Sequence, residues 1–168
     1  MKKVVFTAVL IGTMTVAMHT VSDPMEIKLR DVDYDGLMVV NSDLRLEVTF
    51  DVRKDDCYDE LVFDFYLLMT PREKERGEQF FHCRTVHRFL EKESGYTSGI
   101  SLNQRIVDCI QPRDSKYAVV VTCGGSEAAV ENSEKDRWWE NASLGQPIEN
   151  VLNRFARVPI VREWESGK

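Results

Sequence analysis

Two histidines and a cysteine lie close together in the sequence, at His82, Cys83 and His87. If residues 79–90 form a strand, His82 and His87 point to opposite faces, so they cannot hold one metal ion between them. Cys83 beside His82 suggests a thiolate nucleophile, and a disulfide is the competing interpretation. The segment 95–99 has the glycine spacing of a nucleophile elbow, but its central residue is threonine and no histidine follows His87. The sequence therefore predicts no catalytic residues.

An acidic segment follows the apolar run 44–52 and surrounds Cys57. Its carboxylates are Asp55, Asp56, Asp59 and Glu60. Two carboxylic acids on either side of a glycosidic bond can hydrolyse it, so an acid pair is conceivable here. A polar loop whose carboxylates are simply solvated is the simpler interpretation. An exported hydrolase that uses an acid pair, or a calcium-assisted site, is therefore kept as the alternative function.

The segment Asp31-Val32-Asp33-Tyr34-Asp35-Gly36 contains the only metal-binding pattern in the chain. The pattern D-x-D-x-D-G opens the calcium loop of EF-hand proteins, and Asp31, Asp33 and Asp35 are the candidate calcium ligands. Position twelve of that loop is Ser42 instead of a bidentate glutamate, and the flanking segments have strand patterns. A two-residue hairpin turn at Asp35-Gly36 is the competing interpretation. The two are compatible if the hairpin tip binds the ion, so the expected cofactor is none or calcium.

The N-terminal residues have the features of a secretory signal peptide. Lys2 and Lys3 precede an uncharged apolar run, Val4 to Val16, which is too short to span a membrane. Cleavage is expected after Ala17 or Ser22, and residues 23–168 are expected to form a single domain without a transmembrane segment. The short leader is typical of bacteria, so we expect a secreted or periplasmic protein.

The charge balance makes nucleic acid an unlikely partner. Removal of Lys2 and Lys3 leaves 20 basic and 28 acidic residues, a net charge of −8. No cluster of lysine and arginine stands out, whereas binding to phosphate groups requires a basic surface.

Alternation of apolar and polar residues predicts a protein made mainly of strands. In the clearest run, every second residue from Leu44 to Val52 is apolar and the residues between are mostly polar. The strands are expected at 25–32, 44–52, 60–69, 79–90, 96–102, 117–123 and 127–131. Asn103 is a suitable cap for a short helix at 104–109. Pro147 is placed to begin an amphipathic helix, residues 148–155, before an apolar tail at 158–164.

The segment around Ile110, Pro112 and Tyr117 resembles the start of the second-last strand of immunoglobulin and fibronectin type III domains. The resemblance covers Leu44 to Val130 and concerns the fold alone, because the immunoglobulin Tyr-x-Cys sequence and core tryptophan are missing. It implies an all-β, immunoglobulin-like antiparallel sandwich. A short helix is expected before the Tyr117 strand, with a short C-terminal helix and tail packed on the sandwich.

Four cysteines in an exported chain favour two disulfides, with free buried thiols as the alternative. Zinc is disfavoured, because no two cysteines lie near each other in the sequence. The immunoglobulin-like strand order implies the pairs Cys57–Cys123 and Cys83–Cys109.

These observations favour a non-catalytic binding or structural module of the bacterial cell envelope. Its expected partner is a protein or a glycan. The first candidates for contact residues are Trp138, Trp139, Trp164 and Tyr96, because aromatic residues dominate recognition surfaces. Packing of these residues in the core is the competing interpretation. The tail at 158–164 is expected either to pack on the domain or to dock on a partner.

Overall fold

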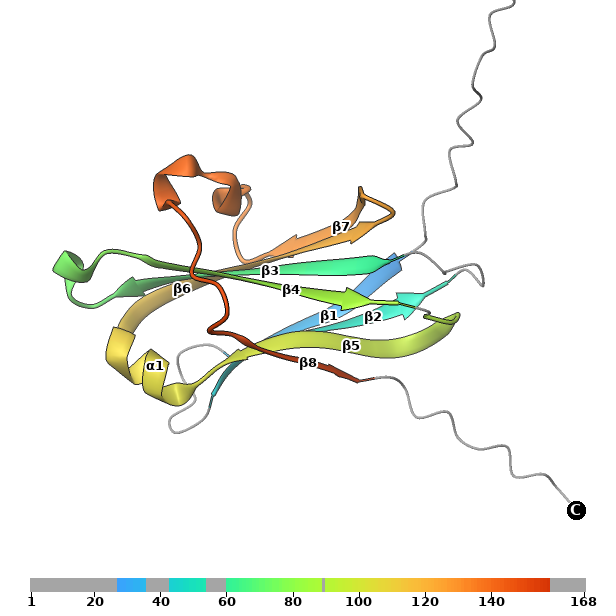
Figure 1. Cartoon of the computed structure of the whole chain (residues 1–168), viewed down its shortest axis with the longest axis horizontal. Helices are drawn as coiled ribbons and strands as arrows, with labels where there is room; N and C mark the ends of the chain where they lie inside the picture. Colours follow the sequence, from blue (N-terminus) through green and yellow to red (C-terminus); the bar gives the residue numbers. More distant parts are fainter. Residues whose placement is uncertain (1–26, 36–42, 54–59, 89, 158–168) are drawn as a thin grey trace, which may run out of the picture.

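The computed structural model of the chain describes residues 27–35, 43–53, 60–88 and 90–157. These residues form two antiparallel four-stranded sheets that pack face to face (Figure 1). In spatial order the first sheet contains β1 (Ile27–Asp35), β2 (Leu44–Val52), β5 (Glu93–Leu102) and β8 (Asn153–Arg157). The second contains β4 (Gln79–His87), β3 (Leu61–Pro71), β6 (Pro112–Cys123) and β7 (Ser126–Asn132). The predicted all-β sandwich is confirmed.

The strand order follows the immunoglobulin pattern with one exchange. The neighbours β1-β2-β5 correspond to immunoglobulin strands A-B-E, and β3-β6-β7 correspond to C-F-G. In an immunoglobulin constant domain, the other neighbour of strand E in its sheet is strand D, which precedes E in the chain. Here β4 stays beside β3 in the second sheet, and the C-terminal strand β8 takes the place next to β5.

The core between the sheets is built by the alternation that the sequence predicts. On β2 the side chains of Leu46, Val48 and Phe50 are fully buried, and those of β3 that face them are equally inaccessible. The rings of Phe50 and Phe63 lie 4.8 Å apart across the two sheets. Large aliphatic and aromatic side chains therefore fill the sandwich, and burial of each is worth roughly 1.5–3 kcal/mol.

The short helix before the Tyr117 strand is confirmed as α1 (Gln104–Ile110). Its cap is Asn103, whose side chain accepts a hydrogen bond from the backbone N–H of Arg105 at 3.0 Å. Gln111 ends the helix in the left-handed conformation, with φ 49°. Within the described residues no helix is long and apolar enough to cross a membrane.

The predicted helix at 148–155 is wrong. Ile148 forms a parallel bridge with Phe81, and its backbone N–H donates to the carbonyl of Phe80 at 2.7 Å. The chain then crosses to the first sheet and pairs with β5 as β8. The apolar spacing of so short a segment fits a helix or an edge strand, and the free backbone edges of β4 and β5 decide in favour of extended structure.

The predicted hairpin turn at Asp35-Gly36 is also wrong. β1 continues to Asp35, which pairs with Arg45 of β2, so the connection between these strands is longer than two residues. The alternation of Val32 and Tyr34 with the three aspartates is a strand pattern. This strand pattern, rather than the turn preference of the Asp-Gly pair, decides the structure up to Asp35.

Candidate functional site

The two outer faces of the sandwich differ, because within the described residues a segment packs on part of one of them. Residues 133–150 cross the outer face of the second sheet and include the 3₁₀ helices η2 (Trp138–Glu140) and η3 (Ala142–Leu144) (Figure 1). Trp138 and Trp139, each 8% exposed, form a small second core with Leu68, Phe80 and Ala118. Trp138 and Trp139 are therefore packing residues and not the predicted contact surface. Trp164 lies outside the described residues.

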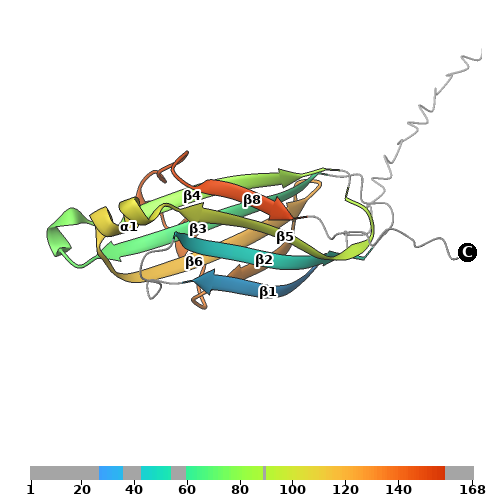
Figure 2. The ribbon, with the colours of Figure 1, turned by 90° about the horizontal axis from the view of Figure 1, so that it is seen from below.

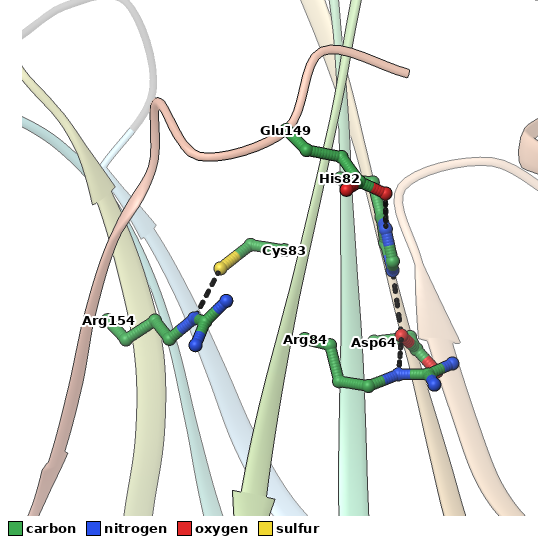
Figure 3. A network of polar contacts seen from close by, with 6 residues as sticks. All are labelled: Asp64, His82, Cys83, Arg84, Glu149 and Arg154. Carbon is green, nitrogen blue, oxygen red and sulfur yellow. Dashed lines mark hydrogen bonds and ion pairs between the residues drawn. The ribbon is translucent and has the colours of Figure 1, made fainter. Parts of the chain in front are cut away.

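Under the edge of this cover lies a network of charged side chains (Figure 3). Asp64 of β3 accepts two hydrogen bonds from Arg84, at 2.8 and 2.9 Å, and its Oδ1 lies 2.7 Å from Nε2 of His82. The register of the sheet brings these groups together, because Asp64 pairs directly with Arg84 on β4. The ring of His82 stacks on Tyr66 with centroids 4.8 Å apart.

The electrostatics of Asp64 favour its charged form. Burial alone would raise the pKa of this carboxyl group, but hydrogen bonds from His82 and Arg84 and the guanidinium charge outweigh it and lower the pKa below its usual value. The same contact raises the pKa of Arg84. Asp64 is therefore a permanently ionised anchor for two basic groups near neutral pH.

The network also holds the covering segment in place. Nδ1 of His82 lies 3.6 Å from a carboxylate oxygen of Glu149, which belongs to this covering segment, residues 133–150 (Figure 3). Backbone hydrogen bonds between Ile148 and β4 lie beside this contact. Both ring nitrogens of His82 thus face carboxylates. His82 therefore connects β3, β4 and the covering segment. This role fits the arrangement better than that of a general base, which needs an unoccupied ring nitrogen for its substrate.

Cys83 lies on the opposite face of β4 from His82, and its side chain is 5% exposed. Nε of Arg154, on β8, approaches its sulfur at 3.3 Å (Figure 3). Cys83 therefore links the edges of the two sheets on the side where the chain crosses between them.

The predicted Cys83–Cys109 disulfide is not present, and both residues carry free thiols. Cys109 is exposed on α1, just before the end of β6 where Pro112 pairs with Pro71. Cys83 pairs with Phe65, and Phe65 pairs with Val119 on β6. At about 3.3 Å per residue, Val119 lies about 23 Å along β6 from Pro112, so Cys83 is far from Cys109. A disulfide requires Cα atoms about 4.4–6.8 Å apart. Cys57 lies outside the described residues, so the Cys57–Cys123 pair stays a prediction.

The structure places the candidate calcium ligands in a paired strand. Asp31 and Asp33 are exposed on β1, opposite Thr49 and Glu47 of β2. An extended strand spreads alternate residues about 6.8 Å apart, whereas a calcium loop wraps its ligands around the ion. Among the described residues no group of three metal-ligating side chains is found. A calcium site involving Asp31, Asp33 and Asp35 remains a prediction that needs a direct measurement.

We expect millimolar calcium to leave the melting temperature of the protein unchanged relative to chelator, because Asp31 and Asp33 are held apart by pairing with β2. A ligand at a hundred times its dissociation constant would stabilise the fold by about 2.7 kcal/mol. Differential scanning calorimetry in calcium and in chelator measures the difference. A shift of several degrees that disappears in Asp33→Ala would establish the site instead.

The other candidate site residues predicted from the sequence do not form a common site among the described residues. His87 faces the core, where its Nε2 lies 2.9 Å from Oγ of Ser98, and burial lowers its pKa. Tyr96 is buried and stacks on Phe50. Glu60 forms an exposed ion pair with Arg88 at 3.4 Å. Asp55, Asp56 and Asp59, the other members of the predicted acid pair, lie outside the described residues.

The part of the chain that the structure describes leaves the outer face of the first sheet uncovered. Figure 2 views this face, and no other described segment crosses β2, β5 or β8. We call it the open face and define it by the outward residues Arg45, Glu47, Thr97, Gly99, Ser101, Asn153 and Phe155. Apart from Phe155 and Gly99, these side chains are polar or charged.

The centre of the open face is shaped by Gly99. A Cβ atom at this position would lie 2.4 Å from Cζ of Phe155 and 2.8 Å from the carbonyl oxygen of Leu46. The missing side chain lets the Phe155 ring lie flat across β5. The guanidinium of Arg45 lies 5.7 Å from the centre of that ring. The result is a half-buried aromatic ring beside a cation on an otherwise polar sheet.

Sequence reasoning missed both the network and the open face, although each leaves a signal. Asp64 is the only charge in the apolar run Leu61 to Met69, and a charge in a central strand requires a partner. Gly99 lies inside a predicted strand, where glycine often marks a close approach by another group. The spacing around Phe155 predicts a helix, so its pairing with Gly99 on a sheet has no signal in the local sequence.

Comparison with known proteins gives the fold and nothing more specific. No protein-family model and no curated protein matches the chain. A crystal structure of a protein from Akkermansia muciniphila is similar, with a TM-score of 0.58 and 18% sequence identity. The match covers 74% of this chain and 80% of that one. At this identity the likeness extends to the β-sandwich fold alone.

Proposed function

We propose that this chain is a non-catalytic binding module of the bacterial cell envelope, which recognises a protein or a glycan through its open face. One observation carries the proposal: among the described residues, a segment packs on part of the outer face of the second sheet, and none crosses the outer face of the first. The cover is substantial, with two buried tryptophans and a charged clamp, whereas the open face carries short polar groups around Phe155 and Arg45.

The composition of the open face supports recognition. Aromatic and arginine side chains contribute most of the binding energy at many interfaces, and Phe155 and Arg45 lie together at its centre. Ser101 and Asn153 supply a hydroxyl and an amide group beside them. The ring of Phe155 is held by close contact with β5, so little side-chain entropy is lost when a partner binds.

Export is part of the proposal and is supported by the sequence of the leader. Lys2 and Lys3 followed by the run Val4 to Val16 have the form of a signal peptide. A secreted or periplasmic location then follows.

The test compares the native protein with Arg45→Glu in pull-downs from envelope extract and on a glycan array. Arg113→Glu is the matched control, because Arg113 is exposed on β6, in the other sheet. We expect one ligand, retained by the native protein and the control and weakened at least about tenfold in Arg45→Glu. Failure of every screen, or equal binding by all three proteins, would contradict the proposal. The two screens distinguish a protein from a glycan.

A further inference from the structure

The edge strand β1 lies at the side of the sandwich opposite the edge strands β4 and β8. β1 pairs with β2 along one edge, and within the described residues no strand pairs with its other edge. Its inward residues Ile27, Leu29, Val32 and Tyr34 are only half-buried, whereas every inward residue of β2 is at most 5% exposed. Additional apolar burial is therefore available along β1.

A bulge at Arg30 sets the direction of the side chains of β1. Leu29 pairs with Phe50 and Asp31 pairs with Thr49, so Arg30 is an extra residue in the strand. Nε of Arg30 donates to Asp51 at 2.6 Å, and the same carboxylate accepts the backbone N–H of Gly95 at 3.1 Å. Because of the bulge, four charged side chains of β1 are exposed on the outer side: Lys28, Arg30, Asp31 and Asp33.

This arrangement makes β1 complementary to itself. When two copies pair antiparallel about a two-fold axis between Arg30 and Asp31, Lys28 lies opposite Asp33 and Arg30 opposite Asp31. On the inner side, Leu29 then lies opposite Val32, and Ile27 opposite Tyr34. A regular strand paired in this register would place inward residues opposite outward ones. The bulge removes that conflict, so charges of opposite sign meet on one face and apolar side chains on the other.

The surroundings of β1 favour such a partner. Asp33 lies directly opposite Glu47 in its own sheet, and like charges in this position destabilise a sheet. Among the described residues, neither Lys28 nor Asp33 takes part in an ion pair. A hollow of about 270 Å³ beside β1, lined by Leu29, Arg30, Val32, Tyr117 and others, leaves room for side chains of a second copy.

We propose that two copies of this chain associate by antiparallel pairing of β1 with β1, so that their first sheets join into one continuous sheet. Isologous pairing of an edge strand closes the assembly as a dimer and removes one exposed edge of each copy. This self-association does not depend on what the open face binds.

Sedimentation velocity of the full purified chain tests the proposal across a range of concentrations. We expect a dimer for the native protein and a dissociation constant at least about tenfold higher for Asp33→Lys, since two Lys–Lys contacts replace two ion pairs. The charge-reversed double variant Lys28→Asp with Asp33→Lys restores opposite charges and is expected to restore the dimer. Asp136→Lys, an exposed substitution of the same charge on the covering segment, is expected to dimerise normally.

Zero-length crosslinking in a mixture of unlabelled and 15N-labelled protein identifies the contact itself. The proposal expects an amide bond between Lys28 of one copy and Asp33 of the other. A monomeric native protein would overturn the proposal. A dimer that persists unchanged in Asp33→Lys would also overturn it, as would failure of the double variant to restore the dimer. Either result would place the contact at β7 or elsewhere.

Discussion

Gly99→Ala is expected to lower the free energy of unfolding by about 2 kcal/mol, because overpacking of a filled site costs about 1–3 kcal/mol. The new methyl group would lie 2.4 Å from the Phe155 ring and 2.8 Å from the Leu46 carbonyl oxygen. The ring can turn away, but the carbonyl belongs to the backbone of β2 and cannot move without disturbing the sheet. Equilibrium unfolding in urea measures the change.

Two further variants separate these contacts. Ser101→Ala changes the same face of β5 two residues away, and we expect its effect to stay below about 0.5 kcal/mol. Relative to Phe155→Ala alone, adding Gly99→Ala should cost only the part due to the carbonyl, because the ring is absent from both proteins. If Gly99→Ala is as stable as the native protein, Phe155 does not lie against β5 as described.

Asp64→Asn is expected to cost about 2 kcal/mol at pH 7, since hydrogen bonds to charged groups contribute about 1.5–3 kcal/mol. The substitution removes the charge that Arg84 and His82 share and weakens the bidentate contact. Urea unfolding of the two proteins at several pH values measures both the loss and its pH dependence.

The sign of the pH dependence follows from the lowered pKa of Asp64. A carboxyl group whose folded pKa is depressed stabilises the fold above its unfolded pKa of about 3.9, and this stability is lost as the pH falls through the folded value. The difference between native protein and Asp64→Asn should therefore be complete at pH 7 and shrink below about pH 4. Asp136→Asn, an exposed control, should show no such difference. A loss that is constant with pH would mean that the Asp64 charge plays no part.

The strands were predictable where one face of the strand is buried and the other is more exposed. The run Leu44 to Val52 became β2 with unchanged ends, because its alternation leaves only one register with a buried face. Asn103 likewise marked the start of α1. By contrast, Ile148, Val151, Leu152 and Phe155 have helical spacing, yet Ile148 pairs with Phe81 of β4 and Phe155 pairs with Gly99 of β5. Local spacing carries no information about such partners.

The site was harder to predict than the fold, because it depends on pairing register. Asp64 and Arg84 are brought together only by the alignment of β3 with β4, which a single sequence does not specify. The same is true of Arg45 and Phe155, which reach each other across β5. For the tryptophans, aromatic character alone did not distinguish a recognition surface from the packing that the structure shows.

Hydroxyl-radical footprinting with mass spectrometry tests the central claim, that one face is covered by the chain and the other is available to a partner. It compares the purified protein with the protein in whole cells that produce it. Trp138 and Trp139 should be protected in both samples, whereas Phe155 should be labelled in the purified protein and protected in cells. Strong labelling of the tryptophans, or equal labelling of Phe155 in both samples, would contradict this account.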